Sequence, residues 1–149
     1  MKELEEYLNS KIGLTKNKNL DVLNRFFTED QLNDLMYKTI AIVGTNGKTS
    51  TANFIYQILL NQKKQVLMFT SPHLVSFIER IQSNRDINFD YISKFVRDFE
   101  KENNIVLGYF ETLFLISCKA FLDNKMDYFI CEAGIGGMLD TTSIIQSKN

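Results

Sequence analysis

The residues with the clearest chemical potential form one short stretch, Gly44–Ser50, with the sequence GTNGKTS. An apolar segment, Thr39–Val43, comes directly before it, and helix-compatible sequence, Thr51–Leu60, comes directly after it. A buried strand, a glycine turn and the start of a helix are the parts of a phosphate-binding loop. The glycines let backbone N–H groups turn toward a polyphosphate, and the helix dipole adds positive potential there. The stretch therefore predicts a nucleotide site.

Lys48 and the hydroxyls after it supply the other groups that such a loop needs. Lys48 would place a positive charge on the β- and γ-phosphates, and the hydroxyl of Thr49 or Ser50 could bind Mg²⁺. The spacing is G-x-x-G-K-T, shorter than the standard G-x-x-x-x-G-K-[ST], because Ile42 stands where the first glycine would fall. An ordinary strand-to-helix turn is the alternative, but the flanking strand and helix favour nucleotide binding.

Polar residues also follow two further apolar segments that read as buried strands. Ser71 and His73 come after Val66–Phe69, and Glu132 comes after Tyr128–Cys131, at the start of a glycine-rich turn. Ligands of open α/β sheets bind at the carboxyl ends of the strands, so these residues should converge on the phosphate loop. A carboxylate and a hydroxyl are the hard oxygen ligands that Mg²⁺ prefers.

Each of these residues has a simpler interpretation when taken alone. Glu132 could pair with a lysine at the end of its strand, and Ser71 could merely turn the chain before Pro72. His73 is the only histidine, and a lone histidine after a strand is more often a structural hydrogen-bonding residue than a catalyst. We therefore expect His73 to lie beside the site.

Hydrophobic periodicity predicts helices around the strands. Residues 1–38 predict a lead-in of three short helices, the third capped by Thr28. Later helices are predicted after Asn88 or Asp90 and over Glu111–Asp123, which is apolar nearly all round. The helix after the phosphate loop has one apolar stripe, formed by Phe54, Ile55, Ile58 and Leu59.

Strand, helix and strand in succession form a βαβ unit, which implies a parallel sheet. The predicted fold class is therefore α/β: a mostly parallel sheet of about three or four strands with flanking helices, similar to P-loop NTPases. We expect one domain over residues 1–149, with the helical lead-in over 1–38 and the α/β core over 39–149.

Bulk composition excludes several classes of protein. A formal net charge of −1 argues against a general binder of nucleic acid or membrane surfaces. No apolar run approaches the ~20 residues of a membrane span, and no signal peptide opens the sequence. Cys118 and Cys131 lie in apolar stretches and are interpreted as reduced core residues, which fits a cytoplasmic setting.

Four motifs in order carry a resemblance to a known family. They are GTNGK followed by hydroxyls, TSPHLVSFIERIQSN, YFE, and FICEAGIGGMLDTTSII. Together they resemble the folylpolyglutamate synthase and dihydrofolate synthase family, a branch of the Mur ligases. The stretch Glu132–Ile145 is similar to the whole of that family's second signature, E-x-G-I-G-G-x-x-D-x-T-x-I-I.

The resemblance implies an ATP-dependent ligase that joins the amine of L-glutamate to a pterin carboxylic acid, dihydropteroate or tetrahydrofolate, through an acyl phosphate. ATP and Mg²⁺ are the implied cofactors. The implied nucleotide site comprises Thr45, Asn46, Gly47, Lys48, Thr49 and Ser50. The magnesium ligands would be Ser71, Glu132 and the hydroxyl of Thr49. The pterin-acid site would comprise Gly108, Tyr109, Phe110, Glu111, Leu139, Asp140 and Thr141.

The reaction suits these groups physically. A carboxylate attacks the γ-phosphoryl group, so the metal on Glu132 and the ammonium of Lys48 would neutralise charge that spreads over the phosphate oxygens. We therefore expect Lys48 and Glu132 to be the catalytic residues. The sequence offers no evident protein nucleophile, and this reaction needs none.

Two departures from the family pattern keep alternatives open. Thr49 occupies a position that is usually glycine in this family and is threonine in cell-wall Mur ligases, so such a ligase is the nearest rival. Family members also have a longer ATPase domain and a C-terminal domain, so we expect this chain to be the first part of the ATPase domain and inactive alone. A non-catalytic nucleotide-binding fragment, completed by a chain that supplies the other half, remains possible, as does a P-loop switch or kinase-like protein.

Overall fold

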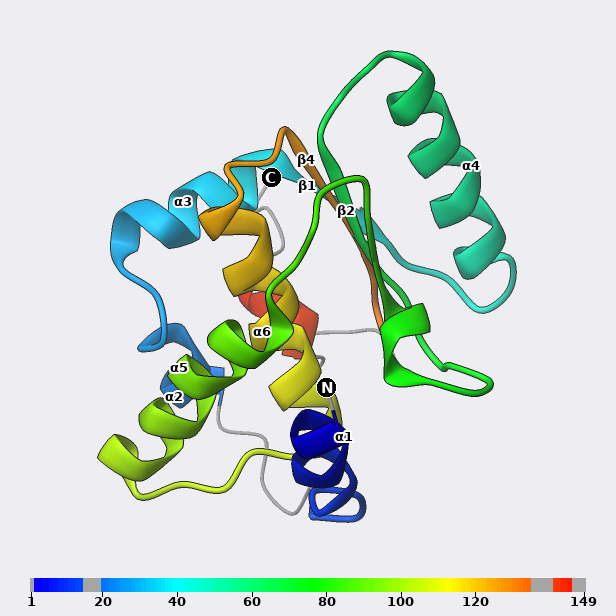
Figure 1. The fold of residues 1–149 in the computed structure, drawn as a ribbon. Helices are drawn as coiled ribbons and strands as arrows, with labels where there is room; N and C mark the ends of the chain where they lie inside the picture. The colour runs from blue at the N-terminus through cyan, green and yellow to red at the C-terminus, as the bar shows by residue number, and fades with distance from the viewer. Residues whose placement is uncertain (1, 15–19, 135–140, 146–149) are drawn as a thin grey trace.

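The computed structural model describes residues 2–14, 20–134 and 141–145, and its centre is a four-stranded sheet (Figure 1). The strands are β1 (Thr39–Ile42), β2 (Val66–Phe69), β3 (Ile81–Ser83) and β4 (Tyr128–Glu132). Their order is β1-β4-β2-β3, with β4 parallel to both of its neighbours and β3 antiparallel to β2. The predicted mostly parallel α/β sheet is confirmed.

Helices cover the two faces of the sheet unequally. Helix α4 (Lys48–Asn61) lies alone on one face, and the other described α-helices gather on the opposite face (Figure 1). These are α1 (Lys2–Asn9), α2 (Leu20–Asn24), α3 (Glu29–Lys38), α5 (Phe89–Asn103) and α6 (Tyr109–Asp123). Two short 3₁₀ helices, η1 (Phe77–Arg80) and η2 (Thr141–Ile145), complete the described elements.

The larger core lies between the sheet and this group of helices. Helix α6 is its centre, because ten of its fifteen residues are buried, in agreement with the predicted all-round apolar helix. The lead-in helices pack into the same core through Leu4, Leu8, Leu23 and Leu35. The described part of this lead-in, residues 2–14 and 20–38, therefore shares one hydrophobic core with the sheet.

Local sequence signals explain how the helices begin. Thr28 caps α3 as predicted: its hydroxyl accepts from the N–H of Gln31, and the Gln31 side chain accepts from the N–H of Thr28. Of the two candidate caps for α5, Asn88 is the one used, because its side chain accepts from the N–H of Tyr91.

The predicted apolar stripe of α4 is half right: Leu59 is buried against the sheet and Ile55 packs beside it, but Phe54 and Ile58 are exposed. Phe54 and Ile58 are 69% and 56% exposed, whereas the residues that face the sheet are Ala52, Tyr56 and Leu59. The small side chain of Ala52 is fully buried, and it lets the helix lie close to the strands below. The outward pair is apolar but lies on the opposite side of the helix.

Two further expectations concern the ends of strands and the cysteines. Strand β1 ends at Ile42, one residue earlier than predicted, and β4 extends one residue further, to Glu132. Cys118 and Cys131 are free and buried, as predicted. Burial raises the pKa of the Cys118 thiol. No helix among the described residues is long and apolar enough to cross a membrane.

Candidate functional site

The loop between β1 and α4 has the backbone of a phosphate-binding turn. Gly44 and Gly47 have φ values of +147° and +76°, a region that side chains disfavour, and Gly47 is the residue that opens α4. The Lys48 ammonium donates to the Gly44 carbonyl oxygen over 2.9 Å, so it folds back across the loop. Because Gly44–Gly47 are exposed, the loop is open to a ligand.

Glu132 stands at the carboxyl end of the central strand β4, directly beside the phosphate loop. Only 2% of Glu132 is exposed. The Thr49 hydroxyl lies 3.1 and 2.9 Å from its two carboxylate oxygens, Oε1 and Oε2. Glu132 is paired with Ile42 in the register of β4 and β1, and the phosphate loop follows β1 directly. This pairing explains how Thr49 and Glu132 meet although they are 83 positions apart in sequence.

Ser71 approaches the same carboxylate from the end of β2. Its backbone N–H donates to Oε2 of Glu132 over 3.4 Å. The structure therefore brings the phosphate loop, Ser71 and Glu132 to one edge of the sheet, as the order of the elements predicts. This contact is made by the main-chain N–H of Ser71 and not by its hydroxyl.

The chain after Ser71 is organised by Glu79. The Glu79 carboxylate accepts from the backbone N–H groups of Leu74, Val75 and Ser76 over 2.8–2.9 Å. These bonds, the one from Leu74 above all, lower the pKa of the Glu79 carboxyl. The turn consequently has a fixed path, although the side chains of Leu74 and Val75 are exposed.

His73 lies in this turn and contacts two residues. The Arg80 guanidinium donates from Nε to Nδ1 of His73 over 2.7 Å, and the rings of His73 and Tyr109 are 6.0 Å apart. The guanidinium also lies 5.3 Å from the centre of the Tyr109 ring. Burial lowers the pKa of Arg80 and raises the pKa of Tyr109. His73 thus links the turn to the first residue of α6.

Residues of the expected pterin-acid site lie at the start of α6. Glu111 is 5% exposed, and its Oε1 accepts a long hydrogen bond, 3.4 Å, from the Thr141 hydroxyl. Its Oε2 is buried with no hydrogen-bond partner among the described residues. Leu139 and Asp140 lie outside the described residues, so their predicted placement stays a prediction.

A buried polar network attaches α1 and α5 to the chain just before Gly108. Glu100 accepts from the Lys11 ammonium, from the Tyr7 hydroxyl and from the Leu107 N–H over 2.5, 2.5 and 2.7 Å. Lys11 also donates to the Leu107 carbonyl oxygen over 3.3 Å. This network fixes the entry to α6, where Gly108–Glu111 lie.

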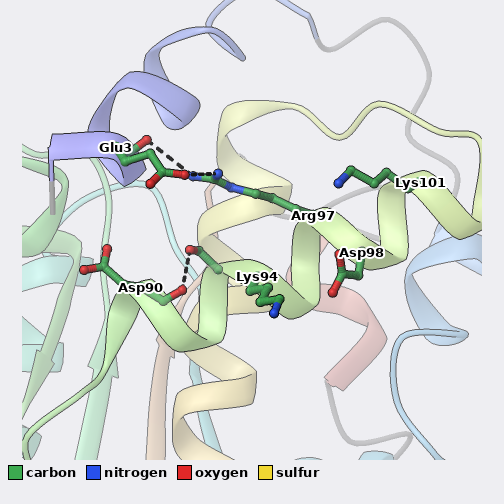
Figure 2. A pocket seen from close by; sticks show the side chains of 7 residues that line it. Glu3, Asp90, Lys94, Arg97, Asp98 and Lys101 are labelled. Carbon is green, nitrogen blue, oxygen red and sulfur yellow. Dashed lines mark hydrogen bonds and ion pairs between the residues drawn. The ribbon is translucent and has the colours of Figure 1, made fainter.

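A surface groove of about 380 Å³ lies away from the strand ends, between α1 and α5 (Figure 2). It is lined by Glu3, Asp90, Ser93, Lys94, Arg97, Asp98 and Lys101. Figure 2 shows Arg97 reaching across to Glu3, and its Nη1 donates to the Glu3 carboxylate over 2.6 Å. Acidic and basic side chains are balanced here, so the groove has no evident preference for an anion or a cation.

Sequence reasoning missed Glu79, Arg80 and the Lys11–Glu100 pair. Glu79 and Arg80 lie in η1, and the capping box formed by Ser76 and Glu79 was the sequence signal that could have indicated this helix. Lys11 and Glu100 are 89 positions apart, and no local pattern indicates that they meet.

Comparison with known proteins agrees with the motifs and the fold. The dihydrofolate synthase/folylpolyglutamate synthase of Buchnera aphidicola subsp. Acyrthosiphon pisum (strain APS) is 36% identical over 108 residues, which are 71% of this chain and 26% of that protein. No protein-family profile matches the chain.

Solved structures of the same enzymes share the fold. "E.coli FolC in complex with DHPP and ADP" has a TM-score of 0.79 and 26% identity, over 96% of this chain and 35% of that one. A bifunctional folylpolyglutamate synthase/dihydrofolate synthase solved with Mn, AMPPNP and L-glutamate bound has a TM-score of 0.76 and 28% identity, over 93% of this chain and 34% of that one.

The fold is thus the mixed α/β fold of the Mur-type ligases. Within that class, the chain is similar to the folylpolyglutamate and dihydrofolate synthases, and the resemblance indicated by its motifs is confirmed. The chain spans about a quarter of the curated relative and about a third of the solved structures.

Proposed function

We propose that this chain provides the nucleotide and metal part of an ATP-dependent ligase that joins L-glutamate to a pterin carboxylic acid through an acyl phosphate. The observation that supports this most is the meeting of Thr49, Ser71 and Glu132 beside a glycine loop. Similar proteins carry names of this activity, and their structures contain ADP, AMPPNP and L-glutamate. Those ligands are the basis for proposing ATP and L-glutamate as substrates here.

The donor set fits a hard divalent cation. Mg²⁺ is held by one or two carboxylates together with hydroxyls, waters and phosphate oxygens. Glu132 supplies the carboxylate, and the hydroxyls of Thr49 and Ser71 are the other candidate ligands. A similar structure contains Mn, which uses the same oxygen chemistry. When bound, the metal would withdraw charge from the phosphate oxygens.

The chain's own groups would then bind and orient the nucleotide. The backbone N–H groups of Thr45–Ser50, at the start of α4, would face the phosphates. Lys48 would exchange its bond to the Gly44 carbonyl for the β- and γ-phosphate oxygens, where the greater negative charge lies. Transfer of the γ-phosphoryl group to the acceptor carboxylate would require this neutralisation.

The acceptor would bind at the start of α6, with Gly108–Glu111 on one side and Leu139–Thr141 on the other. Support comes from the Glu111–Thr141 contact, which joins the two segments. The buried Oε2 of Glu111 needs a hydrogen-bond donor, and N–H groups of a pterin could supply one. The choice between dihydropteroate and tetrahydrofolate belongs to the same proposal.

We propose the domain organisation and the cellular location from the same similarity and from the buried cysteines. Residues 1–149 would form part of a Mur-ligase-type ATP-binding domain, with a helical lead-in over 1–38 and a core over 39–149. Activity would require the part of the relatives that this chain does not span, in the same polypeptide or supplied by a partner chain. Two free, buried cysteines support a cytoplasmic location.

Calorimetric titration of Mg·ATP into the 149-residue protein tests the nucleotide site. We expect saturable binding that disappears in Lys48→Ala and persists in Lys94→Ala, a control lysine in the groove between α1 and α5. Binding that survives Lys48→Ala would contradict the assigned loop. In Glu132→Gln, the affinity for ATP measured with Mg²⁺ should fall more than the affinity for ATP measured without metal.

A second experiment distinguishes the folate reaction from a cell-wall ligase. The chain would be combined with the remaining part of a similar synthase, and ADP release would be followed with pterin acids or UDP-linked acceptors. Turnover with pterin acids alone supports the proposal. Turnover with UDP-linked acceptors alone would contradict the folate reaction and favour a cell-wall Mur ligase, the alternative that Thr49 suggests.

A further inference from the structure

The contact between Arg80 and His73 determines where the imidazole carries its proton. The guanidinium nitrogen Nε of Arg80 lies 2.7 Å from Nδ1 of His73. Arginine nitrogens only donate hydrogen bonds and stay protonated in proteins. Nδ1 must therefore be the acceptor, so it carries no hydrogen, and the neutral imidazole has its hydrogen on Nε2.

Arg80 is held firmly enough to impose this arrangement. Its backbone carbonyl oxygen accepts from the N–H of Thr70 over 2.9 Å, at the end of β2. Its guanidinium is half-buried and lies against the Tyr109 ring at 5.3 Å. The neighbouring Glu79 fixes the backbone on the other side of His73 through three N–H groups. The side chain and the backbone of this turn are thus both held.

The other nitrogen of His73 is open. Among the described residues, none accepts a hydrogen bond from Nε2, and His73 is only half-buried. His73 follows Ser71 by two positions, and Ser71 contacts Glu132. It also lies beside Tyr109, the first residue of α6. The imidazole therefore lies beside the start of α6, in the turn that begins at the strand-end contact of Ser71.

We propose that Arg80 is a positioning residue that fixes His73 as a neutral Nε2–H donor for an anionic oxygen of a bound substrate. The chemistry fits an oxyanion, because a neutral N–H donor and a nearby guanidinium both favour negative charge. The substrate part rests on the proposed function, in which phosphoryl and carboxylate oxygens are the available anions. The assignment of the hydrogen to Nε2 stands independently of it.

The single histidine makes a direct test possible. Protein labelled with ¹⁵N in histidine alone gives one imidazole spin system, and its nitrogen shifts and couplings identify the protonated nitrogen. The spectra would be recorded near pH 8. We expect Nε2 to appear protonated and Nδ1 to appear as the bare acceptor.

Two arginine variants test whether Arg80 is the cause. Arg80→Met should give the averaged nitrogen shifts of a ring that exchanges between both forms, whereas Arg85→Met, at an exposed arginine beyond β3, should leave the pattern unchanged. Wild-type protein with the hydrogen on Nδ1, or with averaged shifts, would overturn the proposal. A wild-type pattern that persists in Arg80→Met would overturn the role of Arg80.

Ligands then test the substrate part. Mg·ADP, Mg·AMPPNP and a pterin carboxylic acid would each be added, with binding measured separately by calorimetry. A shift of the Nε2–H signal with Mg·AMPPNP alone would indicate that His73 contacts the γ-phosphate. A shift with both nucleotides would indicate the β-phosphate, and a shift with the pterin acid would indicate its carboxylate. Binding of all three without any shift would overturn the substrate contact but leave the proposed function standing. If none of the ligands binds, the nucleotide and acceptor sites proposed for this chain are overturned. The ¹⁵N spectra of the free protein still show which nitrogen of His73 carries the hydrogen.

Discussion

The Lys11–Glu100 pair should respond very unequally to the loss of each partner. Both side chains are buried, with 4% of Lys11 and 11% of Glu100 exposed. Glu100 has three donors, so Lys11→Met leaves it with the Tyr7 hydroxyl and the Leu107 N–H. Among the described residues, Glu100→Met instead leaves the Lys11 ammonium with one acceptor, the Leu107 carbonyl oxygen at 3.3 Å. It also deprives the Tyr7 hydroxyl and the Leu107 N–H of their acceptor.

The expected costs follow from these partners. Removing one member of a buried ion pair typically costs about 3–5 kcal/mol, because an uncompensated charge remains. We expect Glu100→Met to lie at the upper end of that range. We expect Lys11→Met to lie at or below about 3 kcal/mol, since two donors still satisfy the carboxylate. The double variant contains neither charge, so it should be no less stable than Glu100→Met alone.

Denaturant unfolding followed by circular dichroism measures all four proteins of this double-mutant cycle. The two single costs should exceed the cost of the double variant by about 2 kcal/mol or more, the coupling expected for a close pair in one network. An additive cycle would refute the reasoning, because it would mean that the two charges do not depend on each other. A cost for Lys11→Met equal to that of Glu100→Met would refute the asymmetry.

Three further changes test other parts of the structure. Burial, the hydrogen bond to Glu100 and the charge of Glu100 raise the pKa of Tyr7. The folded state therefore holds this proton more tightly than the unfolded state, and the free energy of unfolding should fall as pH rises above about 10. Tyr7→Phe should reduce this alkaline loss of stability, measured from denaturant midpoints at several pH values. Gly47→Ala should lower the free energy of unfolding by about 1 kcal/mol in the same assay, because the φ of +76° is unfavourable for alanine even though the space around Gly47 is open. An unchanged denaturant midpoint would contradict this. On α4, Phe54→Ser should change stability by less than about 0.5 kcal/mol, whereas Leu59→Ala should cost about 2 kcal/mol or more. A larger cost for Phe54→Ser than for Leu59→Ala in thermal melts would contradict the observed orientation of the helix.

The sheet could be predicted from sequence because each parallel strand is a short apolar run followed by glycine or polar residues. That pattern also places Glu132 and Ser71 correctly, since parallel strands of one sheet end at the same edge. The contact between Thr49 and Glu132 follows from topology once β1 and β4 are neighbours. No property of the two residues alone would indicate it.

Other features depend on information that local sequence lacks. Only half of the predicted stripe on α4 faces the sheet, because four apolar residues at helical spacing do not reveal which side packs inward when Ala52 and Tyr56 offer a second face. Arg80 reaches His73 only because the turn between them folds back on Glu79. The Lys11–Glu100 pair requires α1 and α5 to pack together, which is a property of the assembled core.

The surroundings of the two buried carboxylates suggest different parts in the proposed reaction. Glu132 is already held by the Thr49 hydroxyl and the Ser71 N–H, so a cation would enter a position whose ligands are oriented in advance. The Thr49 hydroxyl could keep donating to Glu132 and still offer its oxygen as a ligand to a divalent cation. Glu111 has one long hydrogen bond and a buried oxygen without a hydrogen-bond partner among the described residues, so that oxygen still needs a donor. A ligand that donates hydrogen bonds would therefore gain most at Glu111, whereas a cation bridged to phosphates would gain most at Glu132.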